Sequence, residues 1–289
     1  MKISYYPGCT LKTTAKAFET SAMAVLEKLN VQAIELPKWN CCGTVYSMST
    51  DNVMYQLAPI RNLIRTREIG DDRLLVLCSM CYNTLQRANF LVQIKRDTLN
   101  LINDFTYLEK VKYDGSVKVI HLIQLLKEKE NEIKKNVLRK LQGLKVATYY
   151  GCTLVRPKEV GIDDMENPQI MDSIVESVGA EPVYFPYSVE CCGSYHTITD
   201  KELVFNRTYE IINSSHQSGA DIILTSCPLC HFNLDARQKN IMERFPDFKP
   251  LPVIYITQLL SYAFGFGDEI NGFDMNFVNP KQILEKINA

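Results

Sequence analysis

The sequence lacks several features that assign a chain to a common class of protein. Its 289 residues carry a formal net charge of −1, so no long-range field attracts nucleic acid, and we expect none as a partner. No apolar run is long enough to span a membrane; the nearest, residues 254–267, is short and broken by polar side chains. Neither a G-x-G-x-x-G nor a Walker A sequence occurs, so the usual fingerprints of flavin and nucleotide binding are missing.

A secretory signal is missing as well. The first residues, MKISYYPGCT, contain no apolar segment and no cleavage site, so we expect a cytoplasmic protein. The composition is 46% hydrophobic and 22% charged, which is ordinary for a globular protein with a substantial core. In a reducing compartment, the ten cysteines of this chain favour metal binding or catalysis over structural disulfides.

The ten cysteines fall into two sets of five with the same internal order. Each set has a lone cysteine, then a vicinal pair followed by glycine, then a C-x-x-C. Vicinal cysteines seldom pair with each other, because their Cα atoms lie too close for relaxed disulfide geometry, but both thiols can reach one inorganic centre. The first set is Cys9, Cys41, Cys42, Cys78 and Cys81, and the second set is Cys152, Cys191, Cys192, Cys227 and Cys230.

The rest of the chain repeats along with the cysteines. Gly-Cys-Thr-Leu occurs at residues 8–11 and again at 151–154, and each cysteine group directly follows a predicted strand. These strands are predicted at residues 2–6, 31–36, 73–77, 117–121, 145–150, 182–185, 221–225 and 253–256. Helical patterns lie between them, so each half is predicted to be a βαβ-type domain.

The predicted fold is therefore α/β, with two duplicated domains and mostly parallel sheets. We expect the first domain to cover residues 1–142 and the second 143–289, joined by a solvated linker helix in the charged stretch 127–143. Loops at the carboxyl ends of parallel strands form the ligand crevice of such sheets. The five thiols of each set should therefore converge at one sheet edge and bind metal there.

Five thiols at one site exceed the needs of the common metal centres. Structural zinc takes four ligands, and so does a cubane iron–sulfur cluster. A fifth cysteine therefore indicates a cluster with irregular geometry or with one exchangeable ligand. Zinc in both sets, or in the first set alone, remains an alternative.

Two histidines lie close to the second set in sequence. His196 follows its vicinal pair by four residues, and His231 directly follows Cys230. Either could supply protons near neutral pH, although a hydrogen-bonded loop histidine would fit equally well. The first half has Tyr46 and Tyr82 at the corresponding positions, so the two sites are not chemically identical.

The duplicated order of lone cysteine, C-C-G and C-x-x-C resembles the cysteine-rich CCG-domain family over nearly the whole chain. Within that family the sequence is similar to the B subunit of heterodisulfide reductase from methanogenic archaea. The resemblance implies that each set of five cysteines holds one noncubane [4Fe–4S] cluster. It also implies reduction of the coenzyme M–coenzyme B disulfide to two thiols, with Cys41, Cys42, Cys191, Cys192, His196 and His231 as the catalytic candidates.

The resemblance further implies partners. Electrons would come from the ferredoxin-like C subunit of heterodisulfide reductase, supplied by its flavin-containing A subunit and a hydrogenase or formate dehydrogenase. CCG domains also occur in proteins of lactate and glycolate oxidation. An electron-transfer subunit of such an organic-acid oxidoreductase is therefore the alternative function.

Overall fold

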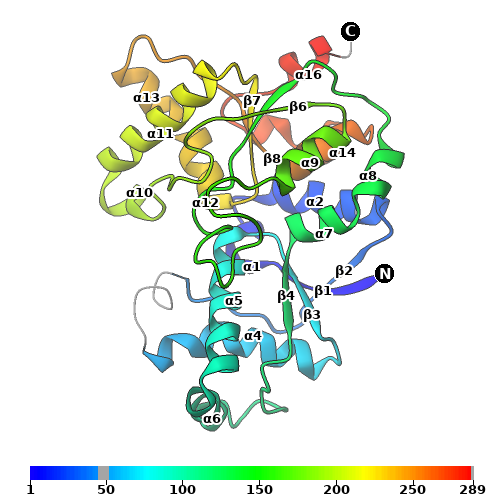
Figure 1. Ribbon diagram of the computed structural model, residues 1–289, viewed down its shortest axis with the longest axis vertical. Helices are drawn as coiled ribbons and strands as arrows, with labels where there is room; N and C mark the ends of the chain where they lie inside the picture. Colours follow the sequence, from blue (N-terminus) through cyan, green and yellow to red (C-terminus); the bar gives the residue numbers. More distant parts are fainter. Residues whose placement is uncertain (45–51, 288–289) are drawn as a thin grey trace.

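Two four-stranded parallel sheets organise the computed structural model, which describes residues 1–44 and 52–287 (Figure 1). The first sheet has the strand order β2-β1-β3-β4, and the second has β6-β5-β7-β8, the same order four strands later. All six strand pairs are parallel. The strands are β1 (Lys2–Tyr6), β2 (Gln32–Glu35), β3 (Arg73–Val76), β4 (Lys118–His121), β5 (Lys145–Thr148), β6 (Glu181–Val183), β7 (Ile222–Thr225) and β8 (Val253–Tyr255). The predicted duplicated α/β fold is confirmed.

The central strands are apolar because both faces of each sheet are covered. In β3, Leu74, Leu75 and Val76 are fully buried, and all four residues of β7 are buried as well. Parallel sheets covered on both faces are typically built from such continuous apolar runs. The edge strand β2, with the sequence QAIE, is instead largely exposed.

The helices of the first half follow its strands in the expected alternation. They are α1 (Gly8–Leu11), α2 (Lys16–Lys28), η1 (Val53–Gln56), α4 (Leu57–Glu68), α5 (Ser79–Ile94), α6 (Arg96–Phe105), α7 (Leu122–Glu128) and α8 (Glu130–Asn136). The second half repeats the alternation with shorter pieces. These are α9 (Ile170–Ser177), α10 (His196–Thr199), α11 (Lys201–Gln217), α12 (Pro228–His231), η2 (Phe232–Ala236), α13 (Gln238–Arg244), α14 (Ile256–Ala263), α15 (Asp268–Asn271), η3 (Phe273–Met275) and α16 (Lys281–Ile287).

The linker differs from the single solvated helix expected for residues 127–143. Helix α7 ends at Glu128, α8 covers Glu130–Asn136, and the following residues are not helical. Ile133 and Leu141 are completely buried, and the backbone N–H of Leu138 donates to the carbonyl of Ala263 at 2.9 Å. The apolar residues among the charges therefore pack onto the second half, which breaks the stretch into short segments.

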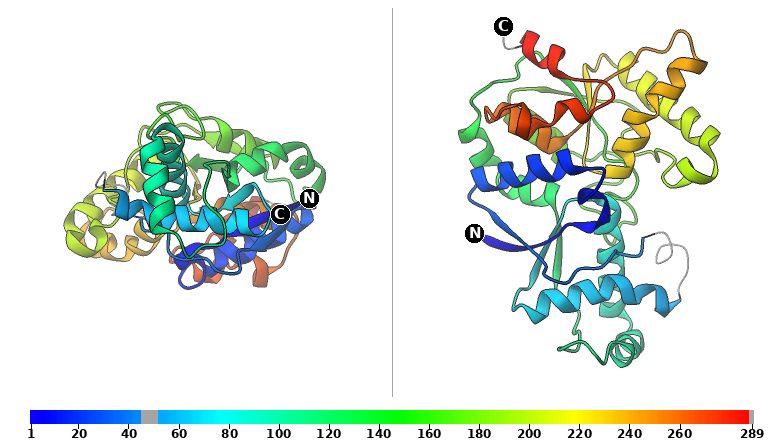
Figure 2. Two further views of the ribbon diagram at one scale, coloured as in Figure 1. Left: turned by 90° about the horizontal axis from the view of Figure 1, so that it is seen from below. Right: turned by 180° about the vertical axis from the view of Figure 1, so that it is seen from behind.

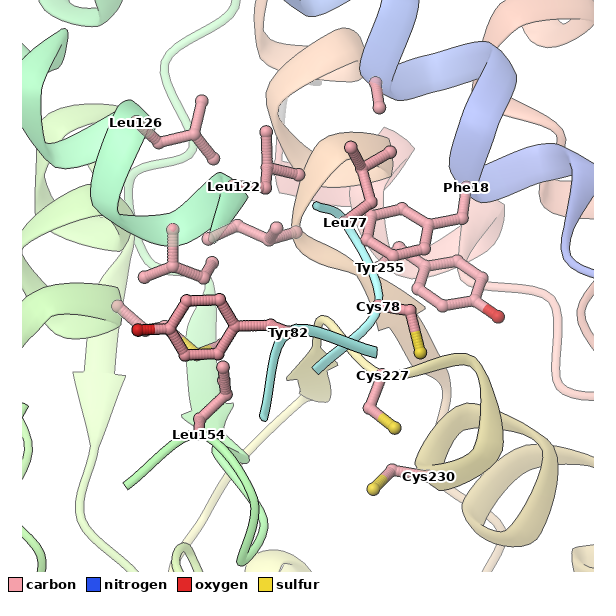
Figure 3. Packing of buried hydrophobic residues seen from close by; sticks show 14 of the residues in the cluster. Phe18, Leu77, Cys78, Tyr82, Leu122, Leu126, Leu154, Cys227, Cys230 and Tyr255 are labelled. Carbon is pink, nitrogen blue, oxygen red and sulfur yellow. The ribbon is translucent and has the colours of Figure 1, made fainter. Parts of the chain in front are cut away.

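The two halves are joined through helices. Helix α2 of the first half lies beside α14 of the second, as Figure 2 shows, and α7 lies beside α9. The hydroxyls of Ser21 and Thr257 are 2.7 Å apart in the first contact, and the rings of Phe18 and Tyr255 stack at 4.3 Å (Figure 3). One continuous apolar core consequently runs through both halves.

Candidate functional site

The cysteines lie at the carboxyl ends of the strands, as the repeat predicts. Cys9 is in α1, directly after β1, and the vicinal pair Cys41 and Cys42 follows β2. Cys78 is the N-cap of α5, directly after β3, and Cys227 is the N-cap of α12 after β7. Since the carboxyl ends of parallel strands share one sheet edge, each half gathers its five thiols there.

The ten thiols form one continuous row. The sulfurs of Cys42 and Cys81 are 3.4 Å apart in the first half, and those of Cys192 and Cys230 are 3.5 Å apart in the second. A thiol–thiol hydrogen bond between Cys78 and Cys227 joins the two halves, and Figure 3 shows these side chains together. The thiol row runs in the order Cys9, Cys41, Cys42, Cys81, Cys78, Cys227, Cys230, Cys192, Cys191 and Cys152.

The thiol row is open at its ends and enclosed in its middle. Cys9 and Cys41 are exposed at one end, and Cys152 and Cys191 are half-buried at the other. The six cysteines between them are buried, and all ten are free thiols. The two sets therefore adjoin inside the protein, and each has its own edge toward solvent.

Contact between the thiols prevents them from ionising together. Hydrogen bonds from the Cys152 and Cys192 thiols lower the pKa of Cys191 to about 2. The same contact raises the pKa of Cys152 far above its usual value, and a hydrogen bond with Cys41 raises the pKa of Cys9. One thiolate is thus stabilised at the expense of its neighbours. A bound cation would remove this conflict, because it stabilises several thiolates at once.

The donor set fits a polynuclear iron–sulfur centre better than a single ion. Among the described residues, no group of three or more histidine, cysteine, aspartate or glutamate side chains is arranged to hold a metal ion. The thiols instead extend along a row, and cysteine thiolates are the ligands that hold iron–sulfur centres. The five thiols of each set are therefore the residues that would hold such a centre.

Two glycines bring the backbone close to a sulfur of each C-x-x-C. Gly8 and Gly151, at φ +69° and +65°, each precede the lone cysteine of their half. A Cβ at Gly8 would lie 3.2 Å from the Cys81 sulfur, and one at Gly151 would lie 3.4 Å from the Cys230 sulfur. Both positions have the left-handed backbone that favours glycine, and at Gly8 a side chain would also crowd the sulfur.

A tyrosine–histidine pair lies beside the C-x-x-C in each half, with the two identities exchanged. In the first half Tyr82 follows the motif and His121 ends β4, with ring centroids 5.4 Å apart. In the second half His231 follows the motif and Tyr255 ends β8, with the rings stacked at 4.1 Å. His121 and Tyr255 were not predicted as site residues, although the repeat of Gln124-Leu125-Leu126 as Gln258-Leu259-Leu260 aligns them.

The two histidines of these pairs, His121 fully buried and His231 half-buried, are both held neutral. Burial lowers the pKa of His121 to about 3 and that of His231 to about 4. His121 Nε2 lies 3.0 Å from the Leu77 carbonyl, and its Nδ1 accepts from the Ile123 N–H at 3.2 Å. The Asn276 amide lies 3.0 Å from His231 Nε2. These contacts position both rings beside the thiol row as neutral hydrogen-bonding groups.

His196 begins α10, four residues after Cys192. Its side chain is exposed, and its Nδ1 is 3.4 Å from the Thr199 hydroxyl. Tyr46, at the corresponding position of the first half, lies outside the described residues. The structure thus brings the ten cysteines and His231 together and leaves His196 toward solvent.

Tyr195 reaches across from the second half to the first set. Its hydroxyl hydrogen-bonds with Thr44, and burial, followed by the nearby thiols of Cys78 and Cys42, raises its pKa. Tyr195 was not predicted as a site residue. Nothing in the local pattern indicates that it faces the cysteines of the other half.

None of the helices in the described part of the chain is both long enough and apolar enough to cross a membrane.

In sequence, the chain is 29% identical to the 8-methylmenaquinol:fumarate reductase membrane anchor subunit of Wolinella succinogenes, over 98% of this chain and 99% of that protein. It is 31% identical to the B subunit of the Ferredoxin/F(420)H(2)-dependent CoB-CoM heterodisulfide reductase of Methanosarcina acetivorans, over 99% of this chain and 97% of that protein.

A solved structure shares the fold. The crystal structure of a hypothetical protein from Helicobacter pylori superimposes with a TM-score of 0.74 at 12% identity, over 96% of this chain. The present chain spans 51% of that longer protein, and the likeness concerns the fold alone. The family described as CCG, cysteine-rich domain, matches twice, at residues 3–86 and 146–235. These two matches include all ten cysteines and both vicinal pairs, and the chain belongs to the CCG cysteine-rich domain family.

Proposed function

We propose that this chain is an iron–sulfur redox subunit that reduces a mixed disulfide to two thiols. Each set of five cysteines would hold one noncubane [4Fe–4S] cluster, as the family resemblance implies. The substrate proposed is the CoB–CoM heterodisulfide, the compound in the names of several relatives of similar length. The observation that carries the proposal is the junction of the two sets at Cys78 and Cys227.

The stoichiometry of disulfide reduction explains why two adjoining sets would be useful. Cleaving one S–S bond to two thiols takes two electrons and two protons, whereas an iron–sulfur centre normally transfers one electron. Two centres side by side would supply one electron to each sulfur of the substrate. Each vicinal pair has one member toward solvent, because Cys41 is exposed and Cys191 is half-buried, while Cys42 and Cys192 are buried behind them. These two pairs are proposed as the cysteines closest to the reaction.

Protons must reach the two product sulfurs. His196 is exposed and follows the vicinal pair of the second set by four residues, so it is the proposed proton donor. His231 is half-buried, hydrogen-bonded to Asn276 and neutral, so its surroundings suit hydrogen bonding within the site better than proton release. Full turnover with an unchanged pH profile in a His196→Gln variant would remove His196 from the proposal.

The electron source is proposed from the family. The ferredoxin-like C subunit of heterodisulfide reductase would deliver electrons, and the flavin-containing A subunit with a hydrogenase or formate dehydrogenase would supply them. The second candidate function is an electron-transfer subunit that binds no disulfide. The likeness over its full length to a subunit of a methylmenaquinol:fumarate reductase favours this alternative.

The deciding experiment measures iron, sulfide and zinc in protein prepared without oxygen, followed by EPR before and after adding CoB–CoM heterodisulfide. We expect about eight irons per chain, no zinc, and a signal that changes with the disulfide. The same metal content with an EPR signal that does not change on adding the disulfide would favour the electron-transfer role. Zinc in the first set would leave at most one redox centre and would contradict the two-centre mechanism.

A further inference from the structure

The asparagine that follows each C-x-x-C marks a difference between the two halves. Asn83 is two residues beyond Cys81, whereas Asn233 is three residues beyond Cys230. Both side chains are fully buried. The extra residue is accommodated by η2, a π-helical turn that directly follows α12. Such turns insert one residue into a helix and often occur at functional sites.

Because of the extra residue, the side-chain amides of Asn83 and Asn233 have different hydrogen-bond partners. Asn83 donates through Nδ2 to the carbonyls of Thr153 and Arg156, both at 2.8 Å, and so ties the first half to the second. Asn233 donates within its own half. Its Nδ2 lies 3.0 Å from the Ser194 carbonyl, 3.3 Å from the Cys192 carbonyl and 3.4 Å from the Cys192 sulfur.

The geometry holds the Asn233 amide beside the sulfur, where one N–H faces the Ser194 carbonyl and the other is shared by the carbonyl and the sulfur of Cys192. The bond to Ser194 orients the Asn233 amide plane, and Ser194 itself has the left-handed φ of 47° that brings its carbonyl to the amide. Because Asn233 is completely buried, water does not compete for its protons. Cys192, the acceptor, is one of the five cysteines proposed to hold the second centre.

We infer that Asn233 tunes the second set: its N–H on Cys192 raises the reduction potential of the iron–sulfur centre held there relative to the first. This inference rests on the proposed function only in that the second set holds such a centre. A hydrogen bond to a ligand sulfur offsets negative charge, which increases by one when the centre accepts an electron, so the bond stabilises the reduced state. Asn83, which contacts carbonyls, provides no such bond to the first set.

The test compares Asn233→Leu with Asn83→Leu. Leucine fills a similar volume and removes the N–H, and both positions are equally buried, so Asn83→Leu controls for the loss of packing and of a buried amide. The midpoint potential of each centre would be measured by EPR during anaerobic titration with dithionite. Cys41→Ser and Cys191→Ser variants would assign the two signals.

We expect Asn233→Leu to lower the potential of the second centre while the first is unchanged, and Asn83→Leu to leave that of the second centre unchanged. An unchanged second potential in Asn233→Leu with full iron content would overturn this inference and leave the proposed function intact. A wild-type chain without iron in the second set would overturn both.

A second measurement on the wild-type chain covers the case in which Asn233→Leu fails to fold. Asparagine labelled with nitrogen-15 only at the side-chain amide would be incorporated, and nitrogen hyperfine coupling to each reduced centre recorded. Coupling in the signal of the second centre supports the inference. Its absence in that signal contradicts it.

Discussion

At the scale of single residues, close approach of backbone to sulfur decides which side chains the site tolerates. The two Gly-Cys sequences look like ordinary turn signals, yet each glycine also faces the C-x-x-C sulfur of its own half. The sequence pattern predicts the cysteines but not this second role of glycine, because the sulfurs lie 73 and 79 residues further along the chain.

We therefore expect Gly8→Ala to weaken metal binding by the first set. The substitution strains a backbone at φ +69° by about 1 kcal/mol and places a methyl group 3.2 Å from the Cys81 sulfur. We expect a lower iron content with loss confined to the first set, measured by metal analysis and EPR. Gly70→Ala is the matched control, because Gly70 has φ +81° with open space around it and should show the backbone cost alone. Equal iron content in both variants would contradict the argument.

His121 should make the metal-free protein sensitive to acid. Burial lowers its pKa from 6.5 to about 3, so the unfolded chain binds a proton in this range that the folded chain excludes. Stability from this group is complete above pH 6.5 and falls as the pH drops toward 3, by up to about 1.4 kcal/mol per pH unit. Urea unfolding at a series of pH values would measure the slope.

In His121→Gln this contribution to the slope should disappear, because the new side chain does not titrate. His231 still contributes, since its pKa is lowered to about 4. The variant should therefore retain about half of the acid sensitivity due to the two histidines. An identical slope in variant and wild type would show that His121 is not the group responsible.

At the scale of elements, the strands followed from the sequence more completely than the connections did. Alternation of apolar runs and helical patterns predicted all eight strands, because local burial on both sheet faces imposes a local pattern. The linker was predicted as one solvated helix, whereas α8 and Leu141 pack onto the second half. Charge is a local property of the sequence, but the surface that accepts Ile133 and Leu141 is assembled from distant residues.

The contact between α2 and α14 should hold the two halves together. Phe18 is fully buried there and stacks on Tyr255 of the other half. Phe18→Ala is expected to lower the free energy of unfolding by about 3–5 kcal/mol. The measurement is urea unfolding followed by circular dichroism, with exposed Thr20→Ala on the same helix as the control, expected within about 0.5 kcal/mol of wild type. A change similar to that of the control would mean that the halves do not depend on this contact.

At the scale of the whole molecule, the two sets should bind metal independently of each other, whereas catalysis should require both. The thiol row joins them at Cys78 and Cys227, but each half supplies its own five cysteines. In Cys42→Ser or Cys192→Ser, we expect about half of the iron to remain, because the other set is complete. Heterodisulfide reduction should be abolished in both, since one remaining centre supplies one electron of two. Turnover that survives in either variant would exclude the cooperation of the two centres.

The sequence by itself determined the duplication, the parallel α/β halves and the grouping of ten cysteines into two sets of five. These properties depend on spacing and on local apolar patterns, which the chain carries from residue to residue. Only the tertiary structure decided that the two sets meet at Cys78 and Cys227, that Tyr195 reaches the first set, and that Asn233 rather than Asn83 donates to a sulfur. Those contacts depend on how the halves pack and on the direction in which a π-helical turn points the Asn233 amide, and the spacing of residues in the sequence encodes neither.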